Sequence, residues 1–473
     1  MENISTELFL SLLALSGAVI VVAALLSGTV ERTGLPQVAV FLALGAILGP
    51  GALALLDVGV ESPLLRVLST LSLVLVLFTD AVSLNLKEIR QHKLLTFIVV
   101  GPGTVMTALL ISIAAWRLLG LSLPLSVILG AALSSTDPVL LRGLVRRPEL
   151  DAPVRQALRL ESGLNDVVLL PIVLIAMALV GGSGAAGESQ QSQLGPLVLR
   201  MFILSPAAGV GVGLAAIGAL DLVRRRIGVR RDYESIYSLG VALLAYAAAE
   251  TMHGSGFLAA FAAGLTIAAL DVELCDCFVE YGETTAEMAL LFTFVLFGTS
   301  LIWSGLTILT PASVAFVALV VVLRPVALVP ALATTSLSWR NRWLIAWFGP
   351  RGLSSLILVL LPIFAGVPGS GALLPLCSLV VLCSVVLHGL SPMVLLRRGR
   401  TVEPDEPLTT IDDIQSMQIR GVPPIVVDAR SDSTYESSTE IIPQAVRLRP
   451  AAAVADAEQL RIPRDQPIAV LCA

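Results

Sequence analysis

The sequence predicts an all-α polytopic membrane protein with about thirteen transmembrane helices, followed by a small α/β segment. Three observations lead to this fold class. Only 14% of the 473 residues are charged and the mean hydropathy is +0.89, whereas soluble domains carry about 25% charged residues. Apolar runs of roughly 20 residues, each long enough to cross a bilayer, recur along the chain. The composition becomes polar abruptly after Arg400.

The predicted spans follow one another with short connections. The acidic start of the chain lacks the basic region of a signal peptide, so the first apolar run is interpreted as a transmembrane helix. The least distinct division, within 235–271, depends on the short stretch His253-Gly254-Ser255-Gly256. The predicted segments are 8–30, 35–56, 62–80, 94–119, 122–145, 156–181, 196–220, 235–252, 254–271, 284–303, 309–334, 341–365 and 371–396.

Clusters of lysine and arginine give the orientation. They follow odd-numbered segments, at 87–93, 142–155, 224–231, 340–342 and 397–400. Cytoplasmic loops hold the excess of basic residues in membrane proteins. We therefore expect a multi-pass protein of the plasma (cell inner) membrane, with the N-terminus outside and the C-terminus in the cytoplasm.

The composition also excludes several function classes. No basic arm indicates nucleic-acid binding. The five cysteines show neither a disulfide framework nor the usual spacing of zinc ligands, and no motif calls for a cofactor. The cysteines are Cys275, Cys277, Cys377, Cys383 and Cys472.

Thr136-Asp137-Pro138 interrupts the apolar segment 122–145. Pro138 lacks an N–H group and so frees a carbonyl about one turn back, near Ser134. Broken membrane helices are tolerated where they face protein or a water-filled cavity, and their ends can coordinate ions. Two interpretations remain open: an ion-binding break, or a proline kink in which Asp137 has a structural partner.

Glu161-Ser162-Gly163-Leu164-Asn165-Asp166 opens the next apolar segment. Glu161 and Asn165 share one helix face, as do Ser162 and Asp166. A carboxylate within the membrane costs about 2.5–3.5 kcal/mol on insertion scales, so such residues are functional by default. An acidic cap on the helix N-terminus would explain Glu161 but not the deeper Asp166. Burial favours the neutral form of a carboxyl, so Asp166 can hold either a proton or a small cation.

Three further charged residues lie near these motifs. Arg351 lies inside segment 341–365 and needs a carboxylate partner, for which Glu161 is the candidate. Arg324 lies inside segment 309–334, and its partner is either Asp137 or a backbone carbonyl. Asp80 ends segment 62–80 and is either an interface residue or an outer acid of the site.

At these residues the chain resembles the sodium/proton antiporters of the cation:proton antiporter-1 family, in its NhaP-type branch. The resemblance covers about residues 8–396. It implies a homodimer, elevator-like alternating access, and an inverted-repeat fold in which segments 122–145 and 341–365 are broken helices that cross. The matching motifs are Thr136-Asp137-Pro138, the Glu161–Asp166 stretch, Gly256-Phe257-Leu258-Ala259-Ala260-Phe261-Ala262-Ala263-Gly264-Leu265 and Gly349-Pro350-Arg351-Gly352.

The resemblance also implies a cation site. Asp166 would carry the proton and the cation in turn. Ser162, Asp137 and the Thr136 carbonyl would help bind Na+.

Supporting roles follow from the same resemblance. Asn165 would stabilise the helix crossing, and Glu161 would pair with Arg351. An Asn-Asp pair in place of two acids implies electroneutral exchange of one proton for one cation. Asp80 stands where relatives often carry a longer glutamate.

The polar segment 401–473, after the membrane domain 1–400, is predicted to form strands at 425–428 and 468–471. It resembles the start of a rhodanese-like domain. Val426-Val427-Asp428-Ala429-Arg430 is similar to the first strand and motif of that domain, Ile442-Pro443-Gln444-Ala445 to its next landmark, and the stretch ending at Cys472 to the strand before the active-site cysteine. The loop that would activate Cys472 is missing from the sequence, so we expect an incomplete domain without sulfurtransferase activity.

The sequence therefore predicts a transporter with a role in pH homeostasis, which exchanges Na+ or Li+ for protons. K+/H+ exchange is an alternative because the ligands do not fix the size of the cation. Two competing hypotheses are a non-transporting sensor of cations or pH with a signalling tail, and a membrane-tethered sulfurtransferase.

Overall fold

The computed structural model divides into two compact units, residues 1–398 and 399–473. Apart from a few isolated positions, the structure describes residues 37–84, 93–145, 150–181, 198–226, 231–270, 276–395, 424–429, 445–449 and 468–471.

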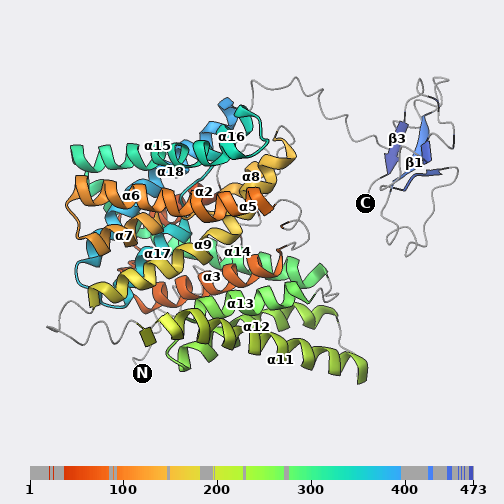
Figure 1. The fold of residues 1–473 in the computed structure, drawn as a ribbon, viewed down its shortest axis with the longest axis horizontal. Coiled ribbons are helices and arrows are strands. Elements are labelled where there is room, and N and C mark those ends of the chain that lie inside the picture. Colours follow the sequence, from red (N-terminus) through yellow and green to blue (C-terminus); the bar gives the residue numbers. More distant parts are fainter. Residues whose placement is uncertain are drawn as a thin grey trace. The chain divides into compact units, whose positions relative to one another are not determined.

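The first unit is built from helices (Figure 1). Its first half contains α2 (Gln37–Leu48), α3 (Pro63–Val82), α5 (Lys93–Ile98), the π-helical turn η1 (Val99–Gly103), α6 (Thr104–Leu119), α7 (Leu123–Ala132), α8 (Pro138–Val145) and α9 (Ala152–Gly181). Its second half contains η3 (Arg200–Leu204), α11 (Ser205–Arg226), α12 (Arg231–Thr251), α13 (Gly256–Ala269), α14 (Asp276–Thr299), η4 (Leu301–Ile308), α15 (Pro311–Ala331), η5 (Leu332–Thr334), α16 (Trp339–Trp347), α17 (Leu353–Phe364), η6 (Ser370–Ala372) and α18 (Leu373–Leu395).

The predicted apolar segments coincide with these helices. Every segment from 35–56 to 371–396 contains a helix, a bent pair or a broken helix, so the predicted positions are confirmed. Segment 8–30 falls almost entirely outside the described residues. Within the described chain, 6 helices are individually long and apolar enough to cross a membrane, or 7 when α14 and η4, bent by 46°, count as one span. The count of about thirteen spans stays a prediction.

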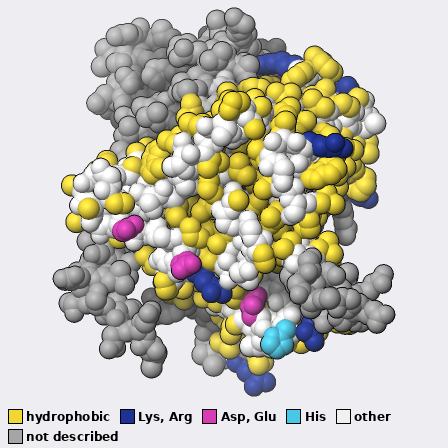
Figure 2. Space-filling model, turned by 90° about the vertical axis from the view of Figure 1, so that its left-hand side faces the viewer, with side chains coloured by type: hydrophobic (Ala, Val, Ile, Leu, Met, Phe, Trp, Pro, Cys, Tyr) yellow, Lys and Arg dark blue, Asp and Glu magenta, His cyan; other side chains and the backbone are white. Residues whose placement is uncertain are grey.

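The surface of the helical unit is that of a protein embedded in lipid. Large apolar side chains such as Phe97, Ile203 and Leu244 are more than half exposed. Figure 2 shows a face covered largely by hydrophobic side chains, with only scattered charged groups. Charged groups are rare on a surface that faces hydrocarbon, so this face agrees with a multi-pass membrane protein.

Helix α9 lies in the middle of the unit. Figure 1 shows α15 and α16 on one side of it and α11 and α12 on the other. Helices α7, α8, α16 and α17 all contact α9. The acidic stretch at Glu161–Asp166, which lies on α9, is therefore surrounded by the halves of two discontinuous spans.

The second unit contains a small parallel sheet. Its strands are β1 (Ile425–Asp428), β2 (Val446–Arg447) and β3 (Ile468–Leu471), in the order β2-β1-β3, and both pairings are parallel. The two predicted strands, 425–428 and 468–471, are confirmed. Cys472 lies outside the described residues, and the rhodanese-like character of the segment stays a prediction.

Candidate functional site

Two spans break in their middle, and the breaks meet. Helix α7 ends at Ala132 and α8 begins at Pro138, while α16 ends at Trp347 and α17 begins at Leu353. Pro138 is well placed as the first residue of α8, because the N–H group that it lacks has no helical partner at that position. The Asp137 N–H donates to the Pro350 carbonyl at 2.9 Å. The two breaks therefore contact each other, while the inverted-repeat relation of the two spans stays a prediction.

The Asp137 side chain caps two helices at once. Its Oδ1 accepts the N–H groups of Val139 at 2.8 Å and Leu140 at 3.3 Å. Its Oδ2 accepts the Leu353 N–H at 2.6 Å. A Cβ atom at Gly352 would collide with this carboxylate. One negative charge therefore offsets the positive N-terminal ends of α8 and α17. This arrangement gives Asp137 a structural role; its predicted role as a cation ligand stays a prediction.

Arg351 compensates the negative C-terminal end of α7, the first half of the first broken span. Its Nη1 donates to the carbonyls of Ser134 at 3.0 Å and Ser135 at 3.2 Å. These carbonyls follow α7, where the helix dipole is negative. Arg351 is only 3% exposed, so its charge acts directly on this helix end.

Arg324, on α15, compensates the second broken span. Its Nη1 donates to the carbonyls of Ile345 and Ala346 at 3.2 and 3.0 Å, near the end of α16. Its Nη2 lies 2.7 Å from both carboxylate oxygens of Glu161. The backbone-carbonyl interpretation of Arg324 is confirmed. The predicted Glu161–Arg351 pair is wrong, because Arg324 binds Glu161 while the Arg351 guanidinium binds the carbonyls after α7.

Asp166 lies on α9 where that helix passes the two breaks. The Ser135 hydroxyl donates to its Oδ1 at 2.5 Å. Asp166 is 4% exposed, and Ser354, in the first turn of α17, is 4% exposed. The first broken span thus supplies a hydroxyl donor to this buried carboxyl group.

Asn165 connects α9 to the first break. Its Nδ2 donates to the Thr136 hydroxyl at 2.7 Å, in agreement with the predicted stabilisation of the crossing. Its Oδ1 is buried and accepts no hydrogen bond from any described residue. A buried oxygen without a donor can accept a bond from a cation or a water molecule.

Two other predicted site residues lie nearby. Ser162 is 8% exposed, and its hydroxyl donates to the Arg159 carbonyl of the same helix at 3.2 Å. Asp80, near the end of α3, faces α9: a Cβ atom at Gly163 would lie 3.9 Å from the Asp80 Cβ. Asp80 therefore lies beside the acidic stretch of α9, and its role there stays a prediction.

The sequence analysis missed Ser354 and its neighbour Ser355, whose hydroxyl donates to the Ser135 carbonyl at 3.4 Å. A signal for them exists. Ser354-Ser355 follows the second break as Ser134-Ser135 precedes the first, and each pair interrupts an apolar run. A pair of serines beside each break places hydroxyl groups where the two breaks meet.

The comparisons with known proteins agree with this architecture. The family described as sodium/hydrogen exchanger, transmembrane, matches residues 19–398. The sodium proton antiporter MjNhaP1 from Methanocaldococcus jannaschii superimposes with a TM-score of 0.64 at 19% identity, over 83% of this chain and 99% of that one. This similarity shows the fold.

Two curated relatives are more similar in sequence. The K(+)/H(+) antiporter NhaP2 of Shewanella sp. (strain MR-4) is 26% identical over 395 residues, which cover 82% of this chain and 67% of the relative. The K(+)/H(+) antiporter NhaP of Alkalimonas amylolytica is 26% identical over 438 residues, 89% of this chain and 74% of the relative. The chain thus matches about two thirds to three quarters of the length of these relatives.

Proposed function

The chain belongs to the transmembrane sodium/hydrogen exchanger family, which matches its residues 19–398, and on that premise we propose that Asp166 alternately carries a monovalent cation and a proton across the membrane. The observation that carries this proposal is the buried Asp166 carboxyl group, which accepts the Ser135 hydroxyl at the first break. An acid at this depth is costly unless it binds something. A proton and a cation neutralise it equally well.

The charges at the crossing support one-for-one exchange. Two guanidinium groups, of Arg324 and Arg351, lie among three carboxyl groups, of Asp137, Glu161 and Asp166. With Asp166 protonated, the remaining charges cancel. With Asp166 ionised and a monovalent cation bound, they cancel again. The unloaded site carries one net negative charge, which is unfavourable in a low-dielectric interior. We therefore propose electroneutral exchange by alternating access.

The proposed ligands of the cation are oxygen atoms at the crossing. Asp166 supplies the charge, and Ser162, the Thr136 carbonyl and the unpaired Oδ1 of Asn165 lie on or beside the same face of α9. Asp137 belongs to the site chiefly as the shared cap of two helices. Carboxylate and carbonyl oxygens suit hard monovalent cations.

Na+ or Li+ is the proposed substrate, with K+ as the second candidate. K+ is retained as a candidate because the relatives from Shewanella and Alkalimonas are named K(+)/H(+) antiporters. The oxygen ligands alone do not discriminate among these ions. We also propose a homodimer in the plasma membrane, with the N-terminus outside and a rhodanese-like segment in the cytoplasm.

Reconstituted vesicles with an imposed pH gradient test the proposal. Na+, Li+ and K+ are added in turn while the luminal pH is followed, with an Asp166→Asn variant as the matched control. Collapse of the gradient that depends on the cation, and is lost in the variant, is the expected result. No collapse with any cation would favour the sensor interpretation, and exchange that survives in Asp166→Asn would refute the assigned site.

A further inference from the structure

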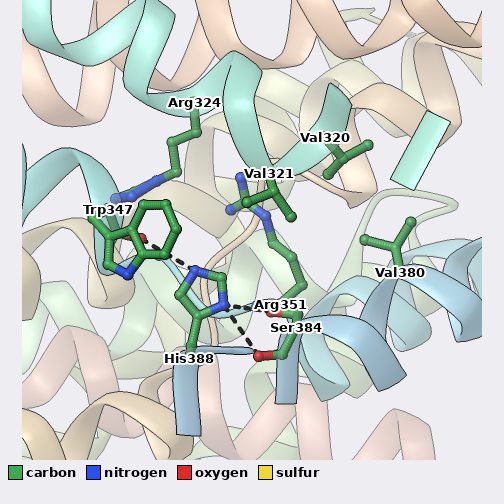
Figure 3. Close-up of a pocket in the computed structure, with 9 residues that line it drawn as sticks. Val320, Val321, Arg324, Trp347, Arg351, Val380, Ser384 and His388 are labelled. Atoms are coloured by element: carbon green, nitrogen blue, oxygen red, sulfur yellow. Dashed lines mark hydrogen bonds between the residues drawn. The ribbon is translucent and has the colours of Figure 1, made fainter. Parts of the chain in front are cut away.

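A pocket lies beside the second break, between α15 and α18 (Figure 3). It is small, with a volume of about 10 Å³, which is close to the space that one water molecule needs. His388 reaches into it from α18, and neither the sequence motifs nor the proposed cation site uses this histidine. The polar residues that line the pocket are Arg324, Arg351, Ser384 and His388.

The ring of His388 contacts one side of the break directly and reaches the other side through Ser384 of the same helix. Nε2 lies 3.1 Å from the carbonyl oxygen of Trp347, which is the last residue of α16. A carbonyl only accepts hydrogen bonds, so Nε2 carries a proton. Nδ1 lies 3.1 Å from the Ser384 hydroxyl, which in turn accepts the Arg351 N–H at 2.7 Å. The dashed lines in Figure 3 show the contacts of the ring.

The surrounding charges favour the neutral ring. The guanidinium groups of Arg324 and Arg351 line the same pocket, while the facing carboxylate, Glu161, is already bound by Arg324. A third positive charge here would be repelled. In the neutral form Ser384 accepts from Arg351 and donates to Nδ1. The Ser384 carbonyl, also 3.1 Å from Nδ1, would be a partner only for the charged ring.

These contacts lead from His388 to the transported ion. Ser384 holds the backbone of Arg351, and the Arg351 side chain holds the Ser135 carbonyl. The Ser135 hydroxyl binds Asp166. The second break has no helical hydrogen-bond ladder. Its geometry therefore depends on separate contacts, among them the Asp137 N–H to the Pro350 carbonyl and the His388 ring to the Trp347 carbonyl.

We propose that His388 is a positioning residue for exchange: as a neutral ring it ties the end of α16 to the start of α17 and so sets the position of the oxygens that face the cation. The proposal rests on the cation/proton exchange proposed above. It assigns His388 no contact with the cation and no proton transfer.

The test compares apparent KM values for the cation and maximal rates in reconstituted vesicles. His388→Phe keeps the ring volume and removes both hydrogen bonds, and it should raise KM roughly 3- to 10-fold, as expected for one or two lost hydrogen bonds. The maximal rate should change less. Val380→Ala, which also changes the pocket wall but removes no hydrogen bond, is the matched control and should keep the wild-type KM.

Further variants separate positioning from folding. His388→Gln places an amide donor near the Trp347 carbonyl and should restore most of the affinity. Ser384→Ala added to His388→Phe should raise KM further, because it also removes the acceptor of the Arg351 N–H. The combined effect should be smaller than the product of the two single effects, since both variants remove the contact between Ser384 and His388. If His388→Phe does not fold, the KM values of His388→Gln and His388→Asn are compared instead. The shorter Asn side chain cannot reach the Trp347 carbonyl, so His388→Asn should have the higher KM.

The outcomes separate the two proposals. An unchanged KM in His388→Phe, with exchange intact in the wild type, would refute the positioning role alone. A pH profile of His388→Gln that departs from the wild type would also refute it, because it would mean that the ring titrates during transport. A wild type without any cation-driven proton flux would refute the proposed function itself.

Discussion

At the scale of residues, the site is organised by pairing helix ends with side-chain charges. Asp137 caps the N-terminal ends of α8 and α17. Arg351 donates to carbonyls at the end of α7, and Arg324 donates to carbonyls at the end of α16. Each of these side chains is buried. The helix dipole concentrates its charge in the first and last turns. A helix that breaks inside a membrane therefore has partial charges at the break, which side chains of opposite charge must compensate. Asp166 is left to bind the transported ions.

The Arg324–Glu161 pair gives a prediction about stability. Arg324→Met leaves Glu161 and two carbonyls buried without their donor, and should cost about 3–5 kcal/mol, as for other broken buried pairs. Thermal unfolding in detergent measures the loss. The double variant Arg324→Met/Glu161→Met should lose less than the sum of the single variants. Single variants as stable as the wild type would contradict the pairing.

Ser135 gives a prediction about pH. Its hydroxyl donates to Asp166, and such a bond favours the ionised carboxylate. Ser135→Ala should therefore favour the protonated form, so that cation binding needs a higher pH. The pH of half-maximal exchange should shift toward alkaline values. Ser355→Ala, whose hydroxyl contacts the Ser135 carbonyl instead, is the control and should not shift it; an equal shift in both variants would argue against a direct effect on Asp166.

At the scale of elements, a local signal predicted the first break but not the partners across it. Pro138 acts on its own backbone, so the first discontinuity could be inferred from the sequence, whereas the second followed only from the family resemblance. The partner of Glu161 depends on how α15 packs beside α9, 163 residues away. Two buried arginines were available, and no local rule chooses between them. Ser354 was missed for the same reason.

Gly352 gives a prediction about the crossing of the two broken helices. A Cβ atom there would meet the Asp137 carboxylate, which must stay close to cap α17. Gly352→Ala should therefore abolish exchange or strongly reduce the folded yield. Gly371, at which a Cβ atom would meet nothing within 4 Å, offers the matched control. Full activity in Gly352→Ala would show that the crossing can widen without loss.

At the scale of the whole molecule, the chain combines a helical membrane unit with a small parallel sheet. The membrane class followed from composition alone, because apolar surface facing lipid leaves a strong signal in the sequence. The sheet was predicted from two short apolar runs, 425–428 and 468–471, and both are strands. The function of that second unit does not follow from three strands, since one fold supports many activities.

The balance of charges predicts how exchange responds to voltage. Since the site is neutral when loaded with either a proton or a cation, its movement transfers no net charge. An imposed membrane potential of either sign should leave the exchange rate in vesicles unchanged at fixed cation and pH gradients. A rate that follows the potential would contradict one-for-one exchange, because moving a charge across 100 mV is worth about 2.3 kcal/mol.

The central claim is that one carboxyl group, that of Asp166, holds the proton and the cation in turn. The apparent KM for the cation, measured in vesicles from about pH 6 to 9, the range in which a buried carboxyl can titrate, tests it most directly. Competition predicts that KM rises as the pH falls while the maximal rate at saturating cation changes little. A KM that is independent of pH across this range would mean that the two ions do not share Asp166.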